Sequence, residues 1–285
     1  MDQKNKICNS ESAKTERRRL RRNVFLIVAA LIVTAIFVIM WSICRWDRRR
    51  KKMSVEEFGK SLPVYVATAP LNLFYEKYSY DDTSPIVDIS DREDLVEDLL
   101  SNWKAIRDEA IPLYSEMGSV QGELFFKRIV KDDKWRRMYL KWYGDIDEDM
   151  REKCPITCDL IEKYPDIHLA MFSLLKSGGR ILPHAGPFRG CLRIHVGLDT
   201  PNSDDCYINI GDERYSWRDG EIVAFDDTYR HEVYNNTDKD RLVLFMDLER
   251  KMMTPLSTRF NKLFIKKIAP LTTRSNQKVE KASLE

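Results

Sequence analysis

Residues 191–198 read CLRIHVGL, and their alternating character indicates a β-strand with two unlike faces. Successive side chains of a strand point to opposite sides of the sheet, so the even-numbered residues form one apolar face. Arg193 and His195 lie together on the other face. Small barrels normally fill their interior with side chains that pack against one another. An arginine and a histidine on one face therefore predict either a polar ligand site or a face in solvent.

Six other short segments have the alternation or the β-branched content of strands, and turn residues separate them. Gly211-Asp212 has the composition of a hairpin turn, and Asp219-Gly220 marks another turn. In the last segment, Arg241 and Asp247 share a face. The six predicted strands cover residues 167–175, 206–210, 214–217, 221–225, 231–234 and 241–248.

The predicted helices of the folded region precede these strands and do not alternate with them. Apolar residues recur at helical spacing from residue 91 to about residue 117, behind a capping-box pattern formed by Ser90 and Glu93. A shorter helix is predicted over 155–164. Helices in front of a run of strands favour a mainly β, jelly-roll-like barrel with an N-terminal helical cover over a doubly wound α/β sheet.

The N-terminal region contains an uncharged stretch, 24–44, that is long enough to cross the hydrocarbon core of a membrane. A buried core helix is the alternative, but clusters of arginine and lysine adjoin both ends. The stretch is too long for a removable signal peptide and lacks a small-residue cleavage site. We predict a single-pass membrane protein. Residues 1–23 carry eight Lys and Arg and residues 45–60 carry seven, so the positive-inside rule gives no orientation.

The charge of the chain is unevenly distributed. The net charge is +2, but much of the positive charge lies in the first 52 residues and the remainder is mildly acidic. A nucleic-acid-binding domain would carry a basic patch on its folded surface, so no nucleic-acid partner is predicted. The predicted organisation is a basic tail over 1–23, a transmembrane helix over 24–44, a basic flank and linker over 45–89, one folded domain over 90–252 and a C-terminal tail over 253–285.

Three of the four histidines, His184, His195 and His231, lie in two glycine- and aspartate-rich turns and a strand. His184 and His231 stand at opposite ends of the set of strands, and adjacent edges of a barrel would bring them together. Imidazole binds iron, zinc or copper, and two histidines with one carboxylate form the facial triad of non-haem Fe(II) oxygenases. Single histidines are more often structural, so a metal site and a structural role both remain open on these grounds.

The carboxylate that usually serves as the third ligand of such a triad is absent from its usual position in the sequence. In the common form the carboxylate stands two residues after the first histidine, and Gly186 occupies that position. Either water or a carboxylate from elsewhere would fill the third position. Asp226, Asp227 and Glu232 are near His231 in sequence, although turn-capping aspartates and a solvated glutamate would look the same.

Five motifs occur in a fixed order between residues 184 and 241. They are His184-Ala185-Gly186, Arg193-Ile194-His195, Asp219-Gly220, Phe225-Asp226-Asp227 through His231, and Arg241. Their order and spacing resemble the aspartyl/asparaginyl β-hydroxylase family. Within that family, the wider stretch from about 95 to 250 is most similar to the bacterial lipid A acyl-chain hydroxylases, which are also tethered to membranes.

The resemblance implies a double-stranded β-helix fold and a dioxygenase that depends on Fe(II) and 2-oxoglutarate. The predicted domain at 90–252 would be the catalytic unit. His184 and His231 would hold the iron through their imidazole nitrogens.

The resemblance also assigns the cosubstrate pocket. Arg241 with Ser173 would bind the distal carboxylate of 2-oxoglutarate, because a guanidinium matches a carboxylate in two parallel hydrogen bonds. Arg193 and His195 would line the same pocket.

The predicted function is hydroxylation of an unactivated C–H bond by a membrane-anchored enzyme, on either a peptidyl Asp or Asn side chain or a lipid acyl chain. The lipid hydroxylases typically have Asp where Gly186 stands, and Gly186 is closer to the peptide hydroxylases. Those enzymes have arginine where this chain has Cys191. The alternative is a membrane-anchored β-barrel that binds a ligand without catalysis, a module that would not need both histidines and Arg241.

Overall fold

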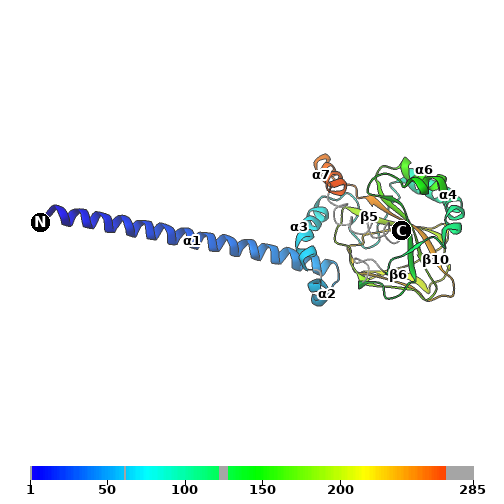
Figure 1. The fold of residues 1–285 in the computed structure, drawn as a ribbon, viewed down its shortest axis with the longest axis horizontal. Helices are drawn as coiled ribbons and strands as arrows, with labels where there is room; N and C mark the ends of the chain where they lie inside the picture. The colour runs from blue at the N-terminus through cyan, green and yellow to red at the C-terminus, as the bar shows by residue number, and fades with distance from the viewer. Residues whose placement is uncertain (1, 61, 122–127, 268–285) are drawn as a thin grey trace.

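The computed structural model describes residues 2–60, 62–121 and 128–267, and one long helix leads into a domain of two antiparallel sheets (Figure 1). The strand order is β1-β2-β3-β10-β5-β8 in the first sheet and β4-β9-β6-β7 in the second. The strands are β1 Gly118–Ser119, β2 Trp135–Trp142, β3 Ile167–Leu175, β4 Arg180–His184, β5 Cys191–Asp199, β6 Cys206–Ile210, β7 Glu213–Ser216, β8 Ile222–Phe225, β9 His231–Asn235 and β10 Arg241–Glu249. The helices are α1 Asp2–Arg50, α2 Val55–Lys60, α3 Leu62–Tyr78, α4 Glu93–Ala110, the 3-10 helix η1 Ile111–Leu113, α5 Glu148–Lys153, α6 Pro155–Lys163 and α7 Pro255–Lys267.

The two sheets enclose an apolar core to which both contribute. Val243 of β10 meets Ile208 and Val233 of the second sheet in one cluster of buried side chains. The odd-numbered residues of β5 point into this interior, where His195 is 5% exposed and lies opposite Phe245 of β10. The predicted pairing of Arg193 with His195 on one face is therefore confirmed, and that face is the interior of the fold.

The other face of the first sheet is covered by helices. The four even-numbered residues of β5 are fully buried and share a cluster with Leu99 of α4 and Leu160 of α6. Figure 1 shows α4 and α6 on this side of the domain. Each strand of the sheet centre thus has an apolar face toward the helices and a more polar face toward the second sheet.

All seven predicted strands are present, and their ends fall within one residue of the prediction. Gly211-Asp212 joins β6 to β7 as the hairpin turn predicted from its composition. The prediction missed β2, because a register shift between Tyr139 and Lys141 interrupts its alternation. It also missed β4, whose Pro183 is unusual in a strand but is tolerated because β4 lies at the edge of its sheet.

The helices also depart from prediction in part. The expected antiparallel β fold with helices in front of the strands is confirmed, but the described residues contain so much helix that the class is mixed α and β, not mainly β. The expected helix at 91–117 ends at Ala110, because Pro112 lacks the N–H that would continue it. The capping box was wrong too: no side chain caps α4, and the hydroxyl of Ser90 hydrogen-bonds to Asp88 at 3.0 Å. The helix predicted at 155–164 is confirmed as α6.

The N-terminal helix has the predicted apolar character. Within α1, Arg21–Arg50 is long and apolar enough to cross a membrane, with a mean hydropathy of 3.0 in its most apolar part, none of which is buried against the domain. Residues 45–89, where we predicted a basic flank and linker, contain the end of α1 together with α2 and α3. Lys51 is fully buried here, so the basic run after the apolar stretch turns partly into the protein. In the predicted C-terminal tail, α7 is folded and residues 268–285 lie outside the described part.

One buried carboxylate joins the end of α1 to the sheets. Asp226, fully buried after β8, lies 3.3 Å from a nitrogen of Arg50, 3.1 Å from one of Arg189 and 3.0 Å from one of Arg250. Glu76 of α3 pairs with Arg50 at 2.8 Å and also with Arg189. The positive charges of three guanidinium groups are therefore balanced by the negative charges of these two carboxylates.

We expect Asp226→Asn to lower the free energy of unfolding of the full chain by about 3–5 kcal/mol, because it leaves buried arginines without their counter-charge. Asp204→Asn is the matched control, since Asp204 is 87% exposed beside Arg218 and its loss should change stability by less than about 0.5 kcal/mol. The measurement is urea unfolding followed by tryptophan fluorescence. Equal effects of the two substitutions would contradict this account of the network.

Candidate active site

The fold brings His184 and His231 together. His184 ends β4 and His231 begins β9, and the two are direct partners in the antiparallel register. Their ring centroids are 4.1 Å apart. The pairing of β4 with β9 thus places side by side two histidines that are far apart in sequence.

Each of these rings is held in one tautomer. Nδ1 of His184 lies 2.8 Å from the carbonyl of Leu182, and Nδ1 of His231 lies 2.9 Å from the carbonyl of Tyr229. A carbonyl only accepts, so each Nδ1 carries the proton and each Nε2 keeps its lone pair. Burial lowers the pKa of His184 to about 3, with the neighbouring His231 as a second cause, and burial lowers that of His231 to about 4. Both rings are therefore neutral at pH 7, which is the form that binds a metal ion.

The space beside Gly186 is filled by a carboxylate from another turn. A Cβ on Gly186 would lie 2.4 Å from the carboxylate oxygens of Asp227, and the Gly186 N–H donates to the backbone carbonyl of Asp227 at 2.7 Å. Arg193 holds this carboxylate through Nε at 3.0 Å and also pairs with Asp247. Asp227 thus stands where a side chain at position 186 would point.

The other two carboxylates that the sequence left open face elsewhere. Asp226 belongs to the arginine network and also accepts from the backbone N–H of Thr228 at 3.0 Å, as a turn cap does. Glu232 faces Arg180 at 3.4 Å on the outer side of β9. Within residues 2–60, 62–121 and 128–267, no three His, Cys, Asp or Glu side chains are grouped closely enough to hold a metal ion. Asp227 is accordingly a neighbour of the two histidines and not a third ligand in this arrangement.

A second cluster of polar groups lies deeper between the sheets. Arg241 is 1% exposed, and its guanidinium lies 4.5 Å from the ring centre of Trp217. Burial lowers the pKa of Arg241 to about 10, so it remains charged at pH 7. Burial also lowers the pKa of His195, with Arg241 and Arg193 as further causes. These effects place the predicted residues of β5, β9 and β10 within one electrostatic neighbourhood.

Several polar atoms in this cluster have no partner among the described residues. They are both ring nitrogens of His195, Nε1 of Trp217 and Nε of Arg241. Buried polar groups are almost always hydrogen-bonded, so a set without partners around a buried cation indicates room for a polar, anionic ligand. Ser173 of β3 faces the same interior, since it pairs with Val243, two residues from Arg241 on the same face of β10. Its hydroxyl accepts a hydrogen bond from Trp135 at 3.0 Å.

Sequence reasoning missed two members of this site. Trp217 was read only as part of a strand, although it is fully buried beside His195 and Arg241. Asp247 was placed on the face of Arg241 but not recognised as a partner of Arg193. The alternation of β10 could have indicated Asp247, because a buried carboxylate requires a partner. No local pattern distinguishes Trp217 from an ordinary core tryptophan.

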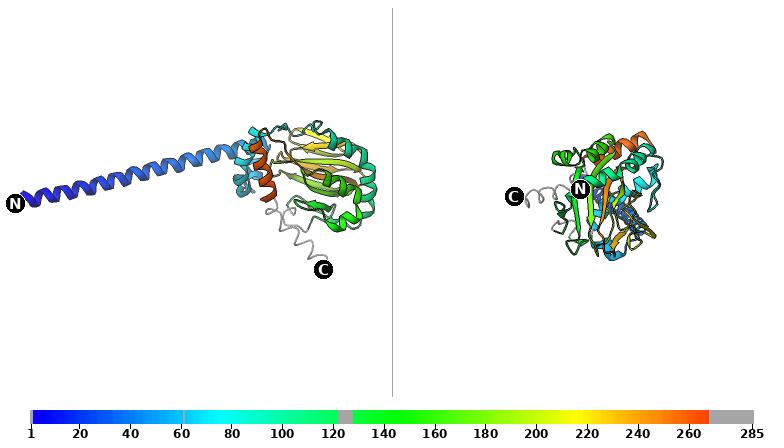
Figure 2. Two further views of the ribbon diagram at one scale, coloured as in Figure 1. Left: turned by 90° about the horizontal axis from the view of Figure 1, so that it is seen from above. Right: turned by 90° about the vertical axis from the view of Figure 1, so that its right-hand side faces the viewer.

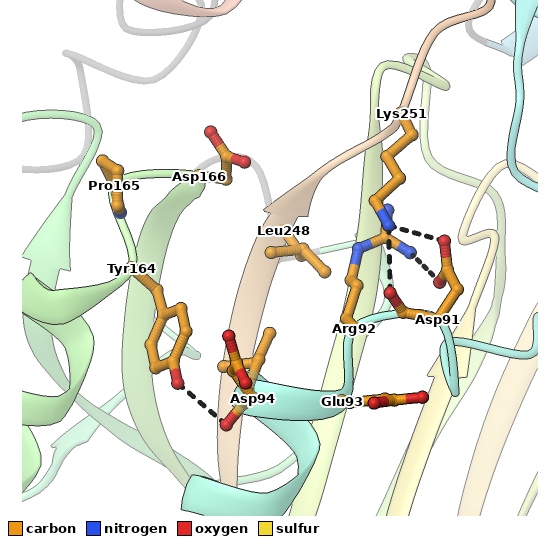
Figure 3. A pocket seen from close by; sticks show the side chains of 10 residues that line it. Asp91, Arg92, Glu93, Asp94, Tyr164, Pro165, Asp166, Leu248 and Lys251 are labelled. Atoms are coloured by element: carbon orange, nitrogen blue, oxygen red, sulfur yellow. Dashed lines mark hydrogen bonds and ion pairs between the residues drawn. The ribbon is translucent and has the colours of Figure 1, made fainter.

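A surface cleft of about 380 Å³ lies away from these residues, between the start of α4, the end of α6 and β10 (Figure 3). It includes Leu248, which is on the helix side of β10 and not on the side of the two histidines. Its two basic groups both pair with Asp91, Lys251 at 2.5 Å and Arg92 at 3.3 Å. We assign this cleft no ligand.

Residues 100–251 match the sequence family described as aspartyl/asparaginyl beta-hydroxylase. The chain belongs to this family. The family consists of iron- and 2-oxoglutarate-dependent hydroxylases, so the chain is a member of a family of enzymes. The match includes the two paired histidines, the Asp227 turn and Arg241.

Curated relatives include one lipid and one protein hydroxylase. The chain is 36% identical over 130 residues to the ornithine lipid ester-linked acyl 2-hydroxylase of Rhizobium tropici, covering 45% of this chain and 46% of that protein. It is 31% identical over 174 residues to the human aspartyl/asparaginyl beta-hydroxylase, covering 58% of this chain and 22% of that protein. The chain thus spans less than half the length of these two relatives. Among solved structures, a Pseudomonas putida prolyl-4-hydroxylase matches with a TM-score of 0.36 and 15% identity, over 53% of this chain and 88% of that one.

We expect Gly186→Ala to destabilise the full chain by about 1–3 kcal/mol, because the new Cβ overlaps the carboxylate of Asp227. The cost should fall below about 0.5 kcal/mol in an Asp227→Gly background, where that space is open. Gly59→Ala in α2 is the control, because nothing lies within 4 Å of its Cβ, and it should be neutral or slightly stabilising. Denaturant unfolding measures all four variants, and an undiminished cost in the Asp227→Gly background would refute the overlap.

Proposed function

We propose that this protein is a dioxygenase that uses Fe(II) and 2-oxoglutarate to hydroxylate a lipid acyl chain, held at a membrane by α1. The observation that carries the proposal is the pair of neutral histidines whose Nε2 atoms keep their lone pairs, next to a buried arginine without a carboxylate partner among the described residues. The proposal includes a double-stranded β-helix for the two sheets and a catalytic domain over residues 90–252.

The residues present fit the iron. His184 and His231 would hold it through Nε2, since each Nδ1 is occupied by a backbone carbonyl. When bound together, Fe(II) and 2-oxoglutarate supply the oxidation: one atom of O₂ enters the C–H bond, and the other enters the succinate formed with CO₂. Asp227 is fixed by Arg193 beside the histidines, where its carboxylate would accept a hydrogen bond from water in the third position.

The residues present also fit the cosubstrate. Arg241 would bind the distal carboxylate of 2-oxoglutarate, with the hydroxyl of Ser173 on the same face. His195 and Trp217 offer ring N–H groups to the same space. Burial of these groups excludes water, which strengthens each of their interactions with an anion.

A lipid substrate is favoured by the position of the turn that carries His184. The hydroxyl of Tyr65 in α3 contacts the carbonyl of Ala185 at 3.4 Å, and Nζ of Lys51, just after α1, donates to the carbonyl of Gly186 at 3.2 Å. The turn therefore rests against the segments next to the apolar helix. The name of the Rhizobium relative describes hydroxylation at carbon 2 of a lipid acyl chain. Carbon 2 lies next to the carbonyl of the acyl chain and is therefore near the surface of a bilayer.

Two alternatives lead to different results in the same experiment. The name of the human relative and the glycine at position 186 favour a peptidyl Asp or Asn side chain. A membrane-anchored β-barrel that binds without catalysis would retain the fold but not need neutral, paired histidines.

We expect His184→Ala or His231→Ala to abolish turnover while the domain remains folded. The full chain, in detergent and without oxygen, is mixed with Fe(II) and 2-oxoglutarate, whose joint binding gives a visible charge-transfer absorption band. The band should appear in the unsubstituted chain and be absent in either variant, and His168→Ala is the control because His168 pairs with Glu249 outside this site. Succinate release with lipid and with peptide then identifies the substrate class. Absence of the band from the folded, unsubstituted chain would favour the non-catalytic alternative.

We expect Arg241→Ala to weaken 2-oxoglutarate binding by about 10- to 100-fold, the equivalent of a charge-assisted hydrogen-bonded pair of about 1.5–3 kcal/mol. Arg241→Lys should restore only part of the affinity, because an ammonium cannot form the paired hydrogen bonds of a guanidinium. Arg214→Ala in β7 is the control, since Arg214 is exposed and contacts Asn209 and Tyr207 instead. Titration of the absorption band measures the affinity, and an unchanged value in Arg241→Ala would remove Arg241 from the pocket.

A further inference from the structure

We propose that α3 and α7 together form a docking surface for the membrane around the point where α1 leaves the domain. This inference rests on the proposed function in one respect, namely that α1 spans the membrane. It adds that the domain itself is seated on the lipid surface and does not stand away from it.

The first observation is that α7 exposes three large apolar side chains and buries two uncharged polar ones. Leu256, Phe260 and Leu263 follow one another at helical spacing and are 79%, 40% and 58% exposed. The buried residues of the same helix include Ser257 and Asn261. A helix at a water-facing surface shows the opposite arrangement, with its apolar stripe toward the core.

The polar inner face of α7 has a structural reason. The side-chain amide of Asn261 donates to the carbonyls of Gly190 at 3.0 Å and Arg250 at 3.3 Å, and its oxygen accepts from the hydroxyl of Tyr75 at 2.8 Å. The inner face thus satisfies backbone groups at the ends of two strands. No such reason within the described residues accounts for the outward apolar face.

The second observation is that α3 carries no charge from Leu62 until Glu76 near its end. Its exposed side includes Leu62, Val64 and Val66, which are 46%, 48% and 38% exposed. Surface helices in water normally carry polar and charged residues on their exposed side. The outer face of α3 therefore shares the apolar character of the outer face of α7.

The two helices form one continuous surface next to α1. The rings of Phe74 in α3 and Phe260 in α7 are 5.0 Å apart, and Asn72 of α3 donates to Asp47 of α1 at 3.2 Å. Figure 2 shows α3 and α7 at the end of the domain from which α1 departs, with α7 running crosswise to α1. Both helices therefore lie at the end of the domain next to the apolar part of α1.

The charges beside this surface select a lipid surface over a second copy of the chain. The basic residues of α7 are Arg259, Lys262, Lys266 and Lys267, all exposed, and the helix has no acidic residue. An apolar stripe flanked by basic residues fits an anionic bilayer surface, in which such helices lie parallel to the membrane. Two copies facing each other through these helices would oppose like charges.

Docking would fix the depth of the candidate active site. The amide of Asn72 in α3 donates to the carbonyl of Pro187 at 3.1 Å and accepts from the N–H of Arg189 at 3.2 Å. The helix on the docking surface thus directly holds the turn that follows His184. A seated domain would present this turn to lipid head groups at a constant distance.

The test places an environment-sensitive fluorophore on the full chain in nanodiscs of phosphatidylcholine and phosphatidylglycerol, one chain in each. Cys8→Ser and Cys44→Ser leave four native cysteines, all of which are buried. The label is attached to Leu256→Cys, Leu263→Cys or, as control, Asp204→Cys, which lies beyond the end of β5 that is farther from α7. A fourth site, Val33→Cys within the apolar part of α1, reports whether α1 is in the bilayer.

We expect lipids carrying a nitroxide quencher to reduce the fluorescence of the labels at 256 and 263 but not of the label at 204. A quencher near the lipid carbonyl should act more strongly than one at the chain end, since an interfacial helix lies shallow. Lys266→Glu with Lys267→Glu should weaken the quenching at 256 and 263.

Unquenched labels at 256 and 263 overturn the docking surface, whatever the label at 33 reports. If the labels are not quenched with one chain per disc but are shielded in a dimer of the chain, the surface binds a second copy. That result also overturns the proposal of membrane docking. An unquenched label at 33 contradicts the anchoring role of α1 in the proposed function, and quenching at 256 and 263 would still support docking. Because the labels need no turnover, a failure of catalysis does not affect this result.

Discussion

The buried carboxylate of Asp226 is the constraint on which the rest of the arrangement depends. It sits among Arg50 at the end of α1, Arg189 after the His184 turn and Arg250 after β10. A buried charge is costly unless it is paired, so these three segments must converge wherever Asp226 lies. Since Asp226 immediately precedes Asp227, the same convergence also determines where the next carboxylate points.

Two consecutive aspartates thus have separate tasks. Asp226 faces the arginines, and Asp227 faces Arg193 and the space left by Gly186. The glycine and the second aspartate are complementary: a side chain at 186 would need the volume that Asp227 occupies. A carboxylate near the two histidines is therefore present in space although it is absent from its usual place in the sequence. In the proposed function, the ion pair with Arg193 keeps the Asp227 carboxylate in a position where it accepts a hydrogen bond from water and does not bind the iron.

The sequence was sufficient for the strands of the sheet centre and for the residues that face each other across them. Alternation in 191–198 placed Arg193 and His195 on one face, and alternation in 241–248 placed Arg241 with Asp247, because period-two patterns report which residues share a face. The structure shows that these faces point into the interior. It was insufficient where the deciding contact joins distant segments. Gly186 meets Asp227 only through the pairing of β4 with β9, and β4 contains a proline, which is unusual in a strand. The helices α3 and α7 were missed because each exposes large apolar side chains, so neither has the apolar inner face and polar outer face that usually mark a surface helix.

The exposed apolar side chains of α3 and α7 have an energetic consequence for an acyl-chain substrate. Each methylene group that passes from hydrocarbon into water costs about 0.8 kcal/mol, so a chain drawn ten methylenes through water would oppose binding by about 8 kcal/mol. A domain seated on the bilayer by α3 and α7 removes the water from that path. The contacts of Tyr65, Asn72 and Lys51 with the turn after His184 then gain a role beyond stability, because they fix the turn relative to the surface on which the domain rests. The buried carboxylate and the outward apolar helices thus act on the same turn, one from the core and the other from the membrane.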